Sequence, residues 1–120
     1  DYDEADREAR RAMDRLTEIG RPRELGATHV VLLASSAGRR DWTAFDEHLE
    51  AATESVRKTG LCEADVAWCA HKAGDLALHA DRAGRSRAAY RFAWYQYRAL
   101  NDEPGMQRVE AVIGDPEDFA

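Results

Sequence analysis

A chain of 120 residues with 44% hydrophobic and 33% charged residues is long enough for one small domain with its own core. Its net charge of −6 argues against nonspecific binding to nucleic-acid phosphates, and no apolar run approaches the roughly 20 residues that cross a bilayer. Alanine takes 22 positions, whereas valine, isoleucine and threonine together take 13, which favours helix over sheet.

Glycine and proline divide the sequence into predicted helices, because each periodic segment ends near one of these residues. We expect helices at about residues 3–19, 22–37, 42–59, 63–83, 86–100 and 106–113. The first carries an apolar stripe with steps of three and four residues, formed by Ala5, Ala9, Ala12, Leu16 and Ile19. Asp41 is predicted to cap the third helix, and Gly84 is predicted to form the turn between the fourth and the fifth.

The helix junctions recur along the chain. Similar junctions end at Gly20, Gly60 and Asp102, at intervals of about 40 residues, and each interval holds one predicted helical hairpin. A hairpin repeated at this period predicts an α-solenoid of antiparallel helical hairpins, in which each pair buries its face on its neighbours. The alternative is a five-helix bundle. Either way we expect residues 1–120 to form a single helical domain.

Residues 73–90 resemble a tetratricopeptide repeat: a first helix with leucine and small residues, a glycine bend, then Ala88, Ala89 and Tyr90 in the second helix. Residues 32–45 repeat this pattern around Gly38. The period near 40 residues is similar to the long repeats of bacterial maltose-regulator-like activators and of multidomain kinases and ATPases. The resemblance implies a protein-interaction module within a larger bacterial signalling or transcription-regulatory protein. The missing initiator methionine fits a fragment of such a protein.

The predicted fourth helix carries the sharpest polar pattern. His71, Asp75 and His79 follow each other at steps of four and form a ridge on one face. We interpret this face as a partner-binding surface with one aromatic anchor among polar groups. Its candidate residues are Trp68, His71, Lys72, Asp75, His79 and Arg82.

A metal site is the alternative interpretation of the same ridge. Histidine and aspartate four residues apart on a helix can chelate a divalent ion. His71 and His79 lie about 12 Å apart along the helix, so at most two of the three side chains bind one ion. We therefore predict no metal ion and no cofactor, and we keep a metal- or small-ligand-binding domain at His71, Asp75 and His79 as an alternative function.

Aromatic residues dominate the predicted fifth helix. Its core face is predicted to contain Phe92 and Leu100. A second stripe consists of Tyr90, Trp94 and Tyr97, bordered by Arg91 and other arginines. Such a stripe most often packs on the next hairpin, with arginine over the rings. Because the chain holds only the start of that hairpin, we expect the stripe to be partly exposed at an end face, which another copy or the rest of a longer parent protein covers. A structural or oligomerisation segment that pairs through such end faces is the second alternative function.

Catalysis has no support in the sequence, which lacks a glycine-rich phosphate loop and a Gly-x-Ser-x-Gly nucleophile motif. Cys62 and Cys69, if both lie on the fourth helix, are too far apart for a disulfide, which indicates reduced thiols and a cytoplasmic protein. The prediction is a non-enzymatic module that binds a protein or peptide in the solenoid groove, without membrane or nucleic-acid partners.

Overall fold

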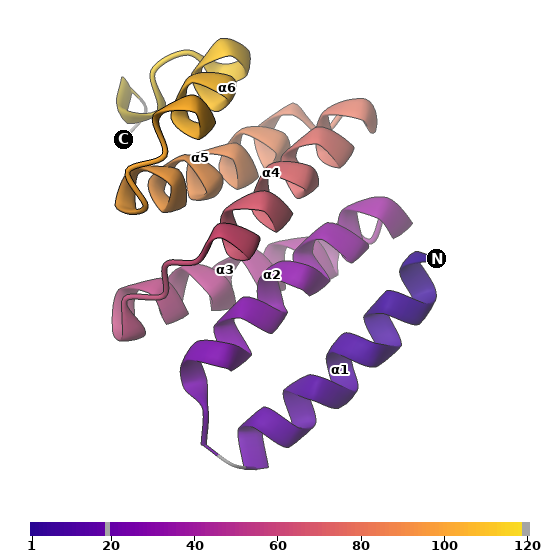
Figure 1. The fold of residues 1–120 in the computed structure, drawn as a ribbon. Coiled ribbons are helices and arrows are strands. Elements are labelled where there is room, and N and C mark those ends of the chain that lie inside the picture. Colours follow the sequence, from indigo (N-terminus) through magenta and orange to yellow (C-terminus); the bar gives the residue numbers. More distant parts are fainter. Residues whose placement is uncertain (19, 119–120) are drawn as a thin grey trace. The chain divides into compact units, whose positions relative to one another are not determined.

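The computed structural model describes residues 1–18 and 20–118, apart from the side chains of residues 16, 18 and 118. Within these ranges the chain forms six α-helices and one short 3-10 helix, with no strand (Figure 1). They are α1 (Tyr2–Glu18), α2 (Pro22–Arg39), α3 (Trp42–Thr59), α4 (Ala64–His79), α5 (Ala83–Ala99), α6 (Glu103–Ile113) and η1 (Pro116–Asp118). The predicted all-α fold class is confirmed. The end of the first predicted apolar stripe, at position 19 and at the side chain of residue 16, lies outside the described residues.

The chain divides into two compact units, Asp1–Leu61 and Cys62–Ala120. In the first unit, α1 packs on α2, and α2 packs on α3 (Figure 1). Because α2 has a helix on two sides, its apolar residues extend over most of its circumference, as is typical of a buried helix. Its apolar run from Val30 to Ala34 is therefore helical, as the sequence predicted, and Val30 and Leu33 are buried, whereas Val31 is 40% exposed.

In the second unit, α4 packs on α5, and α5 packs on α6 (Figure 1). The buried side of α4 is built from small residues, and the buried side of α5 carries large rings. Tyr90 lies against Gly74, where an added Cβ would be 2.6 Å from the ring, and Tyr97 lies equally close to Gly105 of α6. The missing side chains of these two glycines make room for the tyrosine rings.

The same tight turn follows α2, α4 and α5. A non-glycine residue takes the left-handed conformation in each, with φ of 59° at Arg40, 59° at Asp81 and 56° at Asn101. After α4, the amide of Asp81 donates to the carbonyl of Leu78 at 3.1 Å and that of Arg82 to Ala77 at 2.9 Å. This is the Schellman pattern, and equivalent bonds occur in the other two turns. It allows one residue to end a helix and the next residue to begin another.

This turn corrects the predicted boundary between the fourth and fifth helices. The chain turns at Asp81 and not at Gly84, because aspartate tolerates the left-handed conformation. As a result α4 ends at His79, α5 already starts at Ala83, and Gly84 lies in its first turn. Arg82 is the N-cap residue of α5 and does not belong to α4.

The other boundaries lie closer to the prediction. The third predicted helix coincides with α3, and the side chain of Asp41 caps it by accepting from the amide of Ala44 at 3.1 Å. α6 begins at Glu103, three residues before the predicted start. Cys62 precedes α4, so the two cysteines do not share a helix, and both are free thiols. None of the helices in the described part of the chain has the length and apolar character of a membrane span.

Candidate functional site

Five of the predicted binding residues lie on α4, and four of them, Trp68, His71, Lys72 and Asp75, form what we name the Trp68 surface. The side chain of Trp68 is 62% exposed, which is the largest exposure among the large hydrophobic residues that the structure describes. Lys72, one turn further along the helix, is exposed as well. An indole ring left in water costs free energy that contact with a partner would recover.

His71 is the fixed part of the Trp68 surface. Its Nδ1 lies 2.9 Å from the Tyr97 hydroxyl oxygen, and its Nε2 lies 4.0 Å from an Asp75 carboxylate oxygen. The imidazole meets the rings of Tyr90 and Tyr97 edge to face, with centroids 5.6 and 5.8 Å away. Only 12% of its side chain is exposed. Burial lowers the pKa of His71 and Arg108 lowers it further, against the opposite effect of Asp75.

Asp75 links the Trp68 surface to α5. The hydroxyl of Tyr90 donates to its carboxylate at 2.6 Å, and 44% of the Asp75 side chain stays exposed. Burial raises the pKa of Tyr90, and the hydrogen bond to Asp75 raises it further, so the phenol keeps its proton and remains the donor. One side of this carboxylate is therefore held by the core, and the other side is open to a ligand.

His79 does not join the other ridge residues. Its side chain is exposed, and its Nδ1 lies 2.8 Å from the main-chain oxygen of Asp75, so it bonds back to its own helix. Arg82, at the N-cap of α5, also lies off the α4 ridge. Among the described residues, no three His, Cys, Asp or Glu side chains gather closely enough to hold a metal ion.

The expected partial exposure of an end face on α5 is wrong, whereas the packing of the stripe on the following helix is confirmed. Tyr90, Trp94 and Tyr97 are only 1%, 6% and 4% exposed. Helix α6 covers part of this stripe: the indole N–H of Trp94 donates to Glu110 at 2.9 Å, and Tyr97 packs on Gly105.

The predicted core face of α5 is wrong in part, because the stripe of Tyr90, Trp94 and Tyr97 faces the interior. Leu100 is 36% exposed, and Phe92 is only partly buried. Arg91, which was expected to border an exposed face, is partly buried and its Nε has no hydrogen-bond partner. None of these residues offers the exposed stripe on which pairing of two copies was predicted.

Sequence reasoning missed a buried polar cluster in the first unit. Asp6 of α1 is 6% exposed and accepts from Arg10 at 2.8 Å and from Ser35 of α2 at 3.2 Å. Nearby, His29 of α2 and His48 of α3 place their Nδ1 atoms 3.0 Å apart. Both histidines interrupt apolar faces of their helices, and that interruption is the sequence signal that could have indicated a buried pair.

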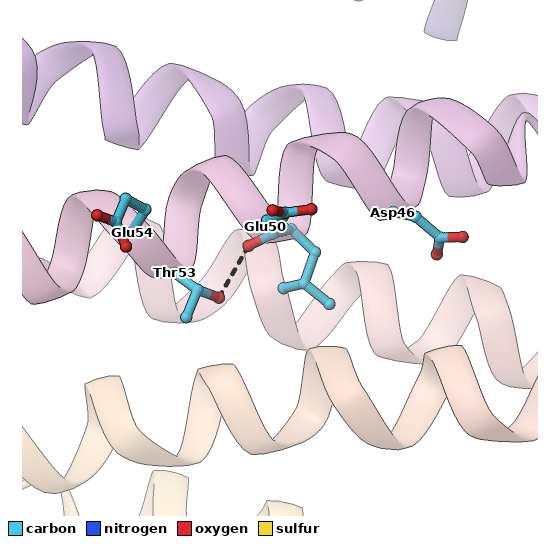
Figure 2. A pocket seen from close by; sticks show the side chains of 5 residues that line it. Asp46, Glu50, Thr53 and Glu54 are labelled. Atoms are coloured by element: carbon cyan, nitrogen blue, oxygen red, sulfur yellow. Dashed lines mark hydrogen bonds between the residues drawn. The ribbon is translucent and has the colours of Figure 1, made fainter.

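An open hollow of about 420 Å³ is lined by α3 residues on the first unit. Figure 2 shows the acidic side chains of Asp46, Glu50 and Glu54 along it, with Thr53 bonded to the main chain. Arg57 and Lys58 pair with Glu54, and the hydrogen bond from Arg57 lowers the pKa of this carboxyl to about 2. Exposed carboxylates on one helix, partly paired already, are typical of a solvated face.

Comparison with known proteins gives no match: no protein-family description, no curated protein and no solved structure corresponds significantly to this chain. The Trp68 surface combines an exposed ring, an exposed cation and a carboxylate held by the core. These groups suit recognition of a partner by contact and hydrogen bonding.

Proposed function

We propose that this chain is a non-catalytic protein-interaction module, similar to tetratricopeptide repeats, that binds a peptide segment of a partner protein at the Trp68 surface. By the same resemblance, it would work in the cytoplasm within a larger bacterial signalling or transcription-regulatory protein. In such arrays the first helix of each hairpin lines the binding groove, and α4 is the first helix of the α4–α5 hairpin.

The observation that carries the proposal is the exposure of Trp68 beside a histidine that the core holds in place. The Trp68 and His71 rings lie 6.4 Å apart, and His71 is fixed by Tyr97. A few anchors of this kind supply most of the binding free energy at protein interfaces, and tryptophan is prominent among them. A rigid neighbour also lowers the entropy that binding costs.

The polar groups around the ring are suited to main-chain recognition. Lys72 offers a donor to peptide carbonyl groups, and the exposed side of Asp75 offers an acceptor to peptide amides. The partner segment would place an apolar side chain on the Trp68 indole.

The test is selection of a displayed random-peptide library on the full chain, followed by measurement of dissociation constants for the enriched peptides. Trp68→Ala should weaken them at least about tenfold. Tyr95→Ala is the matched control because Tyr95 is 42% exposed on α5, and it should change the affinity less than about twofold. Failure to enrich any peptide, or equal losses for both variants, would contradict the proposed function.

A further inference from the structure

The first unit contains a pair of histidines that belongs to no surface described above as a binding site. His29 and His48 come from adjacent helices, α2 and α3, and their Nδ1 atoms are at hydrogen-bond distance, 3.0 Å. The two rings are tilted by 41°, with centroids 5.2 Å apart. His48 is 6% exposed, and its Nε2 is buried without a hydrogen-bond partner. The pair therefore forms a buried polar contact between α2 and α3.

Charged groups face the pair from the helices around it. On α1, Arg10 carries a positive charge that acts on both rings, and Asp6 carries a negative charge that acts on His48. Asp41, at the N-cap of α3, is a second negative charge near His48. Asp6 already accepts from Arg10 and from Ser35 of α2, and Arg39 of α2 lies 3.4 Å from its carboxylate. The neighbourhood thus holds charges of both signs.

The buried setting decides which ring donates. An orphaned N–H in the interior is rarer in proteins than an unused acceptor. We therefore assign the proton to Nδ1 of His48, which donates to Nδ1 of His29, and leave the buried Nε2 of His48 as a bare lone pair. The remaining N–H of the neutral pair is then Nε2–H of His29. His29 lines an α2–α3 hollow of about 180 Å³ with Leu25 and Gly26 and with the charged Glu54 and Lys58 of α3, and water can reach it through this hollow.

Protonating either of the two lone pairs in this arrangement costs free energy. A proton on Nδ1 of His29 would place two N–H groups head to head at 3.0 Å. A proton on Nε2 of His48 would create a buried cation with no partner. We propose that the His29–His48 pair is an acid-sensitive contact between α2 and α3. It holds the two helices together while both rings are neutral and one N–H···N hydrogen bond joins them, and it opens when the pair takes up a further proton.

The electrostatic setting agrees with this geometry. Burial, His29 and Arg10 together lower the pKa of His48 to about 4, against the opposite effects of Asp6 and Asp41. Burial and Arg10 also lower the pKa of His29. The unfolded chain binds these protons more readily than the folded chain, so acid favours opening. The consequence is a first unit that loosens between about pH 6.5 and pH 4, independently of peptide binding at the Trp68 surface.

The direct test is a long-range proton–nitrogen NMR titration of the histidine rings in the ¹⁵N-labelled full chain from pH 8 to pH 4. His48 should show the Nδ1–H tautomer and stay neutral at least one pH unit below 6.5, the value of an unperturbed histidine. Its protonation should coincide with a loss of protection against hydrogen exchange, relative to the intrinsic rate at each pH, that is larger in α2 and α3 than in α5 and α6. A His48 midpoint at about 6.5, or protonation without loosening, would overturn the proposal.

A variant pair gives the second test. His29→Leu/His48→Leu replaces both partners with apolar groups, so no buried polar atom is left unpaired. Protection of the α2 and α3 amides against hydrogen exchange, relative to the intrinsic rate at each pH, should fall from pH 7 to pH 4.5 in the wild-type chain and in the His79→Leu control, and by less than half as much in the double variant. An equal loss of protection in the folded double variant would overturn the proposal; if that variant does not fold, the ring titration decides. Zinc that raises the melting temperature and shifts both Nδ1 resonances would also overturn it, in favour of a metal site.

Discussion

The ring of Tyr90 lies against the backbone of Gly74, at the place where a side chain at position 74 would begin. A Cβ added to Gly74 would be 2.6 Å from the nearest ring atom. The same tyrosine donates its hydroxyl proton to Asp75, so its ring and its hydroxyl are held by neighbouring residues of α4. This contact joins the α4 residues of the Trp68 surface to the core of the second unit.

Gly74→Ala should therefore destabilise the protein. Tyr90 is 1% exposed and cannot move aside without disturbing its neighbours, so we expect a loss of about 1–3 kcal/mol in the free energy of unfolding. Gly84→Ala is the matched control, because a Cβ there meets nothing within 4 Å and α5 is helical at that position. It should stabilise by about 0.5–1 kcal/mol. Urea denaturation of both variants tests this, and similar effects of the two would contradict the close packing.

Tyr97→Phe removes the hydroxyl that fixes His71 while keeping the ring on Gly105. Because the Tyr97 hydroxyl lies 2.9 Å from His71 Nδ1 and the tyrosine is 4% exposed, we expect a loss of about 1 kcal/mol. Tyr95→Phe, at an exposed position on α5, should change stability by less than about 0.5 kcal/mol. Thermal melts followed by circular dichroism would compare the two. Equal melting temperatures would mean that the His71–Tyr97 bond contributes nothing.

Asp81→Gly should stabilise the turn between α4 and α5. Asp81 has φ of 59°, where a side chain is disfavoured and glycine is not. We expect a gain of about 0.5–1 kcal/mol, measured as a higher melting temperature. Asp81→Ala keeps the Cβ in the same conformation and serves as the control, for which no gain is expected. A gain with alanine as well would show that conformational strain is not the cause.

Acid should weaken the fold before its carboxylates titrate. The pKa of His48 is about 4 in the folded chain and 6.5 when it is unperturbed. A lowered histidine pKa means that the unfolded state binds more protons, so stability is complete above pH 6.5 and is lost as pH falls towards 4. We expect a loss of about 2 kcal/mol at pH 4.5.

Urea denaturation at pH 7.0, 5.5 and 4.5 measures this loss. Burial alone would raise the pKa of Asp6, but the hydrogen bonds and charges of Arg10, Ser35 and Arg39 lower it below its ordinary 3.8. The contribution of Asp6 to the free energy of unfolding is therefore lost only at still lower pH. A constant free energy of unfolding from pH 7.0 to 4.5 would contradict the prediction.

The all-α fold class and several helix boundaries could be predicted from the sequence because they depend on local properties. Alanine content and apolar periodicity predict helix, and Asp41 caps α3 through its own side chain. The exposure of Trp68 could be predicted too, since Trp68 interrupts a polar ridge on one face. The turn at Asp81 could not be predicted. Glycine is the commonest residue in the left-handed conformation but not the only one, so the pattern pointed to the nearby Gly84.

Tertiary structure decided which aromatic stripe of α5 is buried. Phe92 and Tyr90 are equally suited to a core by composition, and only the positions of α4 and α6 turn the stripe of Tyr90, Trp94 and Tyr97 inward. Likewise, His29 and His48 are 19 residues apart, and only the packing of α2 on α3 brings their nitrogens together. Periodicity reports the faces of one helix in isolation. The partner of each face depends on contacts between residues distant in the chain, where close packing selects one arrangement.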